Sequence, residues 1–92
     1  MSFVYILFSL RDHKMYIGIT ENLKQRIMSH NAGRVLSTKH RRPLKLIYFE
    51  GYINRGDAQR REKYFKTSPG KKAIKMMLRI TLQENISPVP PA

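Results

Sequence analysis

Two ionisable side chains occupy positions that a small protein would normally fill with apolar residues. Leu23 and Ile27 are the large aliphatic residues expected to anchor a short helix. Arg26 and His30 fall on the same face of that helix. A charged group on such a face is costly unless it is paired, binds a metal or lines a cavity. The planar guanidinium of Arg26 could stabilise the extra negative charge of a phosphoryl transition state.

The next predicted helix repeats this pattern with an acid. Glu62 lies between Ala58 and Phe65, the apolar positions of that helix. A lone carboxylate could hold one hard divalent cation through water and phosphate oxygens, as magnesium sites often do. Tyr5 or Tyr16 could then orient or deprotonate the attacking water, if a metal or cation lowered the tyrosine pKa from its usual ~10. Together these groups could carry out metal-assisted phosphodiester hydrolysis.

Structural alternatives exist for each of these residues. Arg26 and Glu62 could pair with each other as a salt bridge, or Arg26 could extend to the edge of its apolar face. Tyrosines in strands are more often part of the core than of a site, so Tyr5 and Tyr16 prove nothing alone. Thr38, Tyr48 and Tyr64 are interpreted as structural first.

A hairpin is expected at the start of the chain. Residues 3–8 form a continuous apolar and β-branched run, typical of a strand buried on both faces. Residues 15–19 form a second strand, and the polar stretch between them predicts an antiparallel turn. If the loop holds an even number of residues, Tyr5 and Tyr16 point to the same face. An odd loop or a bulge would separate them.

Residues that cap or end helices predict the remaining helices and the third strand. Asn22, with Gln25 three residues later, predicts a helix over residues 23–31 that stops at Gly33. Residues 34–42 are expected to be a loop, residues 44–52 a third strand, and residues 55–66 a second helix. Ser68 is expected to cap a third helix, whose apolar stripe is Ala73, Ile74, Met77 and Ile80. The order ββαβαα predicts an α+β fold: one domain over residues 1–82 and a flexible proline-rich tail over residues 83–92.

The composition limits the kinds of molecule that the protein is expected to bind. The chain of 92 residues carries 18 Lys and Arg against 6 acids, a net charge of +12, which favours nucleic acid first and an anionic membrane second. Cysteine is absent, which excludes disulfides, thiolate metal sites and cysteine nucleophiles. No apolar run approaches the ~20 residues of a spanning helix, and the start lacks a signal-peptide pattern. We expect a cytoplasmic protein that acts without a membrane and could associate with the nucleoid.

An ordered set of residues resembles the GIY-YIG nuclease family, and in particular its compact single-domain bacterial branch of UPF0213-like predicted endonucleases. The second signature is intact as Tyr16-Ile17-Gly18, and the first resembles Phe3-Val4-Tyr5 with its tyrosine kept. The other matching positions are Arg26, His30 and Glu62. The resemblance covers residues 2–80.

The resemblance implies a three-stranded mostly antiparallel sheet flanked by helices, and a nuclease site built on it. It implies one Mg²⁺ or Mn²⁺ ion on Glu62 and hydrolysis of a DNA strand to 5′-phosphate and 3′-hydroxyl ends. Tyr5 would be the general base and Tyr16 would position the water. Arg26 would stabilise the phosphoryl charge, and His30 would contact a phosphate or orient Tyr16. The sequence departs from several relatives in lacking an asparagine in residues 69–78 and an appended targeting domain.

Basic residues around these positions are expected to bind phosphates without reading bases. The expected nucleic-acid-binding residues are Gly18, Lys39, Arg41, Arg42, Arg60, Arg61 and Lys63, with Gly18 allowing close approach to the tyrosines. Lys71, Lys72, Lys75 and Arg79 could equally form a solvated helix face.

The sequence thus predicts a divalent-metal-dependent endonuclease acting on branched, flapped or damaged DNA in repair or recombination. The alternative is a weakly active or inactive module that binds DNA or RNA together with a protein partner. An adaptor that binds protein through residues 87–92 is a third, weaker hypothesis.

Overall fold

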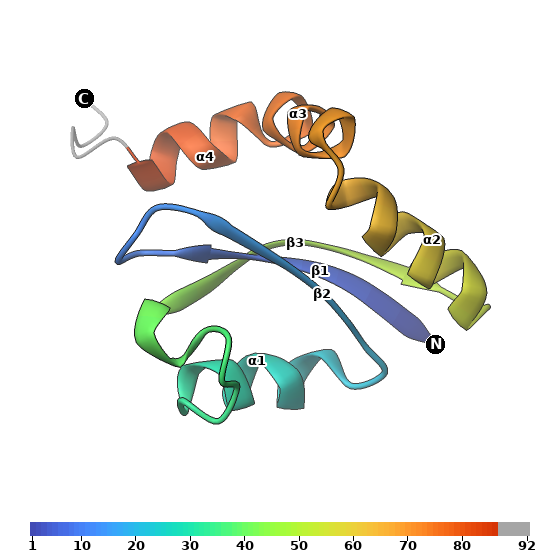
Figure 1. The fold of residues 1–92 in the computed structure, drawn as a ribbon, viewed down its shortest axis with the longest axis horizontal. Coiled ribbons are helices and arrows are strands. Elements are labelled where there is room, and N and C mark those ends of the chain that lie inside the picture. Colours follow the sequence, from blue (N-terminus) through green and yellow to red (C-terminus); the bar gives the residue numbers. More distant parts are fainter. Residues whose placement is uncertain (87–92) are drawn as a thin grey trace.

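A three-stranded antiparallel sheet forms the centre of the fold in the computed structural model, which describes residues 1–86. The strands are β1 (Ser2–Ser9), β2 (Met15–Thr20) and β3 (Leu44–Tyr52), arranged in the order β2-β1-β3. Because β1 is central, Val4 to Phe8 are all buried, which confirms the predicted strand covered on both faces. The α+β fold and the antiparallel sheet are confirmed (Figure 1).

The register of the hairpin places both tyrosines on one face of the sheet. Tyr5 pairs with Gly18, and Leu7 pairs with Tyr16. Since alternate residues of a strand share a face, Tyr5, Leu7 and Tyr16 all point the same way. Phe8 pairs with Met15, so an even number of residues connects the paired positions. The condition set for the two tyrosines to share a face is therefore met.

One helix covers the face that carries the tyrosines. This helix, α1 (Leu23–Asn31), packs Leu23 and Ile27 against a small core that includes Leu7. The side chain of Asn22 accepts a hydrogen bond from the backbone N–H of Gln25 at 3.2 Å, as the capping pattern predicts. Gly33, which adopts a positive φ of 77°, lies just after the helix end.

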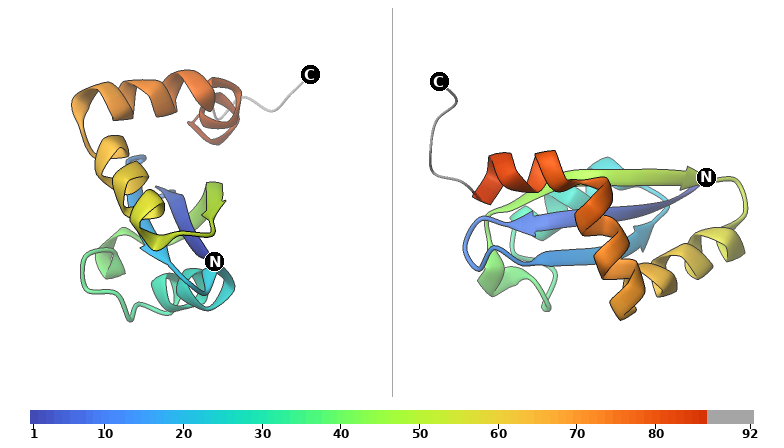
Figure 2. Two further views of the ribbon diagram at one scale, coloured as in Figure 1. Left: turned by 90° about the vertical axis from the view of Figure 1, so that its right-hand side faces the viewer. Right: turned by 90° about the horizontal axis from the view of Figure 1, so that it is seen from above.

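Three helices of the described chain lie toward the other face (Figures 1 and 2). They are α2 (Arg55–Phe65), α3 (Ser68–Met77) and α4 (Arg79–Ile86). Ala58, Phe65 and Ile74 are completely buried there against Val4 and Ile6 of the central strand. Asn54 caps α2, as predicted, by accepting a hydrogen bond from the backbone N–H of residue 56 at 2.7 Å.

The C-terminal part differs from the prediction. Thr67, not Ser68, caps α3, and the helix ends at Met77 instead of continuing through Ile80. The backbone turns at Leu78, so this residue is buried while Met77 is 44% and Ile80 64% exposed. The predicted stripe was therefore wrong beyond Ile74, because the chain changes direction there.

Two shorter segments also differ from the sequence expectations. The stretch expected to be a loop contains a short 3-10 helix, η1 (Lys39–Arg41). Residues 83–86, expected to begin a tail, belong to α4. Residues 87–92 lie outside the described part of the chain. Across residues 1–86 there is no helix of the length and apolarity needed to cross a bilayer.

Candidate active site

The phenol of Tyr5 stands at the centre of a buried polar cluster. The Tyr5 side chain is 1% exposed, and its hydroxyl lies 2.8 Å from His30 Nε2. The Nε–H of Arg26 donates a hydrogen bond to the same hydroxyl oxygen at 3.3 Å. Tyr16 lies beside these groups, with its ring centroid 6.3 Å from that of Tyr5 and 5.0 Å from that of His30. Strands β1 and β2 and helix α1 thus bring four predicted site residues together.

Helix α1 turns Arg26 and His30 inward, as the sequence predicted. Leu23 and Ile27 fix the helix on the sheet, so residues one turn apart on that side face the tyrosines. His30 is completely buried, whereas Arg26 is partly exposed. The cluster therefore has a closed end at His30 and an accessible end at Arg26.

Gly18 makes room for the Tyr5 ring. A methyl group at Gly18 would stand closer than 3.0 Å to three atoms of the Tyr5 ring and hydroxyl. Real Cβ atoms essentially never show such contacts. The phenol therefore crosses over the strand β2, which is an edge strand, at the residue that has no side chain. This close approach agrees with the expectation for Gly18, although here the space is filled by Tyr5 itself.

Burial keeps the side chains of Tyr5 and His30 neutral at rest. Burial is the largest influence on Tyr5 and raises its pKa, although the hydrogen bond from Arg26 acts in the opposite direction. Burial, followed by the positive charge of Arg26, lowers the pKa of His30 to about 4. His30 is therefore a neutral imidazole at pH 7, with one ring nitrogen protonated and the other an acceptor. The hydrogen bond with Tyr5 raises the pKa of Arg26, which remains a cation.

Glu62 lies on α2 and is partly buried. Ala58 and Phe65 anchor this helix on the sheet, and the side chain of Glu62 between them is 19% exposed. Its negative charge is the smallest of the influences on the pKa of Tyr5, which it raises. The carboxylate pairs with Lys66 at 3.4 Å on its own helix. The alternative of an Arg26–Glu62 salt bridge was therefore wrong, since each side chain has another partner.

A single carboxylate is available here for a cation. Within residues 1–86, no three His, Cys, Asp or Glu side chains gather into a metal-binding group. Only one Glu62 oxygen takes part in the Lys66 contact. This donor set suits a cation such as Mg²⁺, which keeps several waters and binds through one or two carboxylates plus phosphate oxygens. It does not suit zinc, which needs three or four protein ligands.

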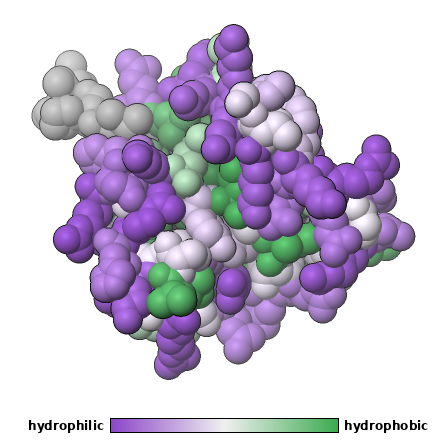
Figure 3. All heavy atoms as spheres, viewed as in Figure 1, coloured by the Kyte–Doolittle hydropathy of each residue, from purple (hydrophilic) through white to green (hydrophobic). Residues whose placement is uncertain are grey.

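Two of the predicted phosphate-binding arginines form salt bridges with acids of the protein. Arg41 pairs with Asp12 at 2.6 Å, and Arg61 pairs with Glu50 at 2.9 Å. We therefore do not carry these two residues into the proposed interface. Four other predicted cations are exposed: Lys39, Arg42, Arg60 and Lys63. Hydrophilic side chains cover most of the face drawn in Figure 3.

A second polar cluster, not predicted from the sequence, lies where α2 meets β3. Tyr48 and Tyr52 both donate hydrogen bonds to Glu50 at 2.6 Å, and Arg61 holds this carboxylate through two nitrogens at 2.9 and 3.0 Å. The Arg61 guanidinium also lies 4.3 Å from the centre of the Phe65 ring. Burial alone would raise the pKa of Glu50, but the hydrogen bonds, led by the one from Arg61, lower it. The cluster fixes the part of α2 that carries Glu62, so Tyr48 is structural, as interpreted.

Thr38 is the buried partner of His30. Its side chain is completely buried, and its Oγ1 lies 2.7 Å from His30 Nδ1. The sequence offered no signal for this contact, since Thr38 lies in a polar segment between α1 and β3. The interpretation of Thr38 as structural did not include contact with a site residue.

Comparisons with known proteins identify the family of this chain. The GIY-YIG catalytic domain matches residues 1–75. The chain is 46% identical over 67 residues to a UPF0213 protein of Clostridium perfringens, covering 72% of this chain and 71% of the relative. It is 40% identical over 76 residues to one of Staphylococcus haemolyticus, covering 82% and 92%. No solved structure matches. The chain therefore belongs to the GIY-YIG family of nuclease domains, and its relatives are small bacterial UPF0213 proteins.

Proposed function

We propose that this protein is a divalent-metal-dependent endonuclease that hydrolyses DNA phosphodiester bonds. Membership of a nuclease family supports the reaction class. The observation that carries the finer proposal is the position of the Tyr5 hydroxyl, held between Arg26 Nε at 3.3 Å and His30 Nε2 at 2.8 Å, with the charge of Glu62 as the smallest influence on its pKa. A phenol oxygen in this setting is an acceptor for a proton of the attacking water.

Arg26 is oriented for the phosphate. The hydrogen bond to Tyr5 raises the pKa of this guanidinium, so it is a permanent cation held by a phenol. Its Nε faces Tyr5 while the side chain stays partly accessible. A fixed guanidinium stabilises the charge that develops on the phosphoryl oxygens without reorganising during the reaction. Arg26 is therefore the proposed transition-state stabiliser.

Glu62 would hold the metal, and Tyr5 would be the general base, with Tyr16 positioning the water. When bound, the cation would neutralise phosphate charge and make the bound water and the neighbouring phenol more acidic. This matters because burial raises the pKa of Tyr5 in the metal-free protein. We propose that His30 acts on Tyr5 rather than on a phosphate, because it is completely buried.

The substrate is proposed to be DNA with a branched, flapped or damaged structure. The net charge of +12 favours a polyanion. The exposed Lys39, Arg42, Arg60 and Lys63 are proposed to contact phosphates, which gives binding that weakens with salt and reads little sequence. We further propose a cytoplasmic protein whose nuclease domain extends through α4.

The test is cleavage of nicked, flapped and branched DNA by the purified protein, with Mg²⁺, Mn²⁺ or a chelator. Glu62→Gln and Arg26→Ala should each reduce the cleavage rate by about a hundredfold or more while DNA binding is kept. Glu84→Gln is the matched control, because it removes one exposed acid from α4, outside the cluster. Cleavage that survives the chelator or both site variants would refute the proposal. DNA or RNA binding without cleavage under every condition would instead establish a nucleic-acid-binding module.

A further inference from the structure

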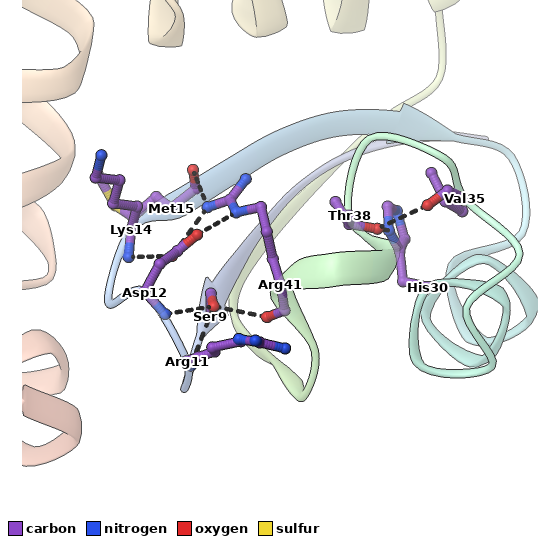
Figure 4. Close-up of polar contacts among 9 residues, drawn as sticks. All are labelled: Ser9, Arg11, Asp12, Lys14, Met15, His30, Val35, Thr38 and Arg41. Carbon is purple, nitrogen blue, oxygen red and sulfur yellow. Dashed lines mark hydrogen bonds and ion pairs between the residues drawn. The ribbon is translucent and has the colours of Figure 1, made fainter.

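A chain of hydrogen bonds runs from the Tyr5 phenol to the loop between α1 and β3. The Tyr5 hydroxyl contacts His30 Nε2 at 2.8 Å, and His30 Nδ1 contacts Thr38 Oγ1 at 2.7 Å. Thr38 Oγ1 in turn lies 3.5 Å from the carbonyl oxygen of Val35, to which it can donate. Figure 4 shows the Thr38 side chain beside the imidazole, with the Val35 carbonyl next to it. Tyr5, His30 and Thr38 are all buried.

The number of protons available to these hydrogen bonds decides which ring nitrogen of His30 is protonated. A neutral imidazole carries one N–H, so His30 donates at one nitrogen and accepts at the other. The Tyr5 oxygen already accepts from Arg26, and in the described residues His30 Nε2 is the acceptor within hydrogen-bond distance of its O–H. If Nε2 carried the proton instead, the buried Tyr5 O–H would have no acceptor in the protein, which is costly. Nδ1–H then donates to Thr38, whose own proton turns to Val35.

We propose that Thr38 is a positioning residue, whose hydroxyl keeps the His30 proton on Nδ1 so that Nε2 accepts the hydroxyl proton of Tyr5. The consequence lies at the Tyr5 end of this series of hydrogen bonds. A phenol oxygen has two lone pairs, and only one is used by Arg26. With its proton directed to His30, Tyr5 presents the remaining lone pair to the attacking water, and when the oxygen takes a proton from that water its own proton passes to His30 Nε2. This step rests on the proposed nuclease function.

The segment that carries Thr38 is fixed at its far end. Arg41, at the end of η1, pairs through Nε with Asp12 Oδ2 at 2.6 Å. The Ser9 hydroxyl donates to the backbone carbonyl of Arg41 at 2.6 Å (Figure 4). The turn between β1 and β2 therefore holds η1 in place, and Thr38 immediately precedes η1. This gives Arg41 a supporting role for the segment that carries Thr38.

Nitrogen NMR of the metal-free protein, with ¹⁵N in its histidine rings, tests the assignment without any activity. We expect a pyrrole-like resonance for His30 Nδ1 and a pyridine-like resonance for Nε2 in the wild type and in Thr38→Ser. In Thr38→Val, which keeps the shape but loses the hydroxyl, the proton should move wholly or partly to Nε2. Ser37→Ala, the neighbouring exposed hydroxyl, is the matched control and should leave the wild-type pattern. A wild-type proton on Nε2, or no change in Thr38→Val, would overturn the proposal.

Kinetics separate positioning from simple loss of structure. At saturating flapped DNA with Mg²⁺, Thr38→Val should cleave about tenfold more slowly with unchanged DNA affinity, while Thr38→Ser stays close to wild type. An unchanged rate in Thr38→Val, or a loss that Thr38→Ser does not rescue, would overturn the positioning role. If Thr38→Val does not fold, the wild-type spectrum still decides the position of the proton. If the wild type cleaves nothing, the nuclease proposal fails, whereas the NMR measurement still tests the His30 assignment.

Discussion

Replacing Gly18 by alanine directly tests whether the site depends on the path of the Tyr5 ring. The added methyl group would lie closer than 3.0 Å to the ring and hydroxyl of Tyr5, whereas ordinary contacts begin at 3.4 Å. Tyr5 must therefore retreat by something on the order of 1 Å. A retreat toward α1 is blocked by His30, whose Nε2 already lies 2.8 Å from the hydroxyl, and a retreat in any other direction lengthens that bond.

The expected cost follows from two opposing effects. Overpacking of a well-packed interior typically costs about 1–3 kcal/mol of unfolding free energy. Replacing glycine by alanine at an ordinary backbone conformation stabilises a protein by about 0.4–1 kcal/mol, because it restricts the unfolded chain. We therefore expect Gly18→Ala to be destabilised by roughly 1–2 kcal/mol. A misplacement of about 1 Å at the reacting groups should also slow cleavage by about a hundredfold.

Gly51→Ala is the matched control in the same sheet. Gly51 lies on the other edge strand, and its added methyl group would meet the Met1 sulfur at 2.7 Å and an edge atom of the Phe3 ring at 3.2 Å. The Met1 side chain can rotate away, so this variant should be as stable as the wild type or slightly more stable. The assays are urea unfolding and single-turnover cleavage of flapped DNA. If Gly18→Ala matched Gly51→Ala in both, the proposed dependence on the Tyr5 ring position would be incorrect.

Three further predictions concern the supports of the site. Arg61→Leu removes the guanidinium that holds the partly buried Glu50. This variant should lower the free energy of unfolding in urea by about 1–3 kcal/mol, a range reduced because the pair is partly accessible to solvent. Wild-type stability would show that the ion pair is not needed. Gly70→Ala should lower the free energy of unfolding more than Gly18→Ala does, because its methyl group would clash with the backbone carbonyl of Tyr64, which cannot rotate away. An equal or smaller loss of stability would contradict the close crossing of α2 and α3. The lowered pKa of His30, about 4 against 6.5 unfolded, means that the unfolded chain binds the extra proton more readily. Stability from this group should be fully present above pH 6.5 and fall by on the order of 2–3 kcal/mol as pH drops toward 4, and a His30→Gln variant that kept the same pH slope would refute this assignment.

Much of the local structure was predicted because it depends on neighbours in the chain. The two-residue repeat of strands placed Tyr5 and Tyr16 on one face, and the 3.6-residue repeat of helices turned Arg26 and His30 inward. The caps at Asn22 and Asn54 were also confirmed, because a cap bonds only to residues two or three positions away.

The pairings between distant segments were decided by the tertiary structure. Periodicity indicates that Arg26 and Glu62 face inward, but it does not say which partners they meet there. The fold gave Arg61, not Arg26, to a carboxylate, and that carboxylate is Glu50. It also placed Thr38 against His30, although nothing in the polar loop sequence marks this contact.

The sequence alone therefore determined the strands, the first two helices and the faces that they turn inward, and the positive charge of the protein, but not η1 or the break between α3 and α4. The tertiary structure decided that Tyr5 crosses over Gly18 on the edge strand, where its hydroxyl meets Arg26 and His30 of α1. The physical reason is the distance along the chain over which each kind of interaction acts. Backbone periodicity and capping act over a few residues, whereas side-chain contacts across the sheet depend on how the whole chain packs its two layers of helices.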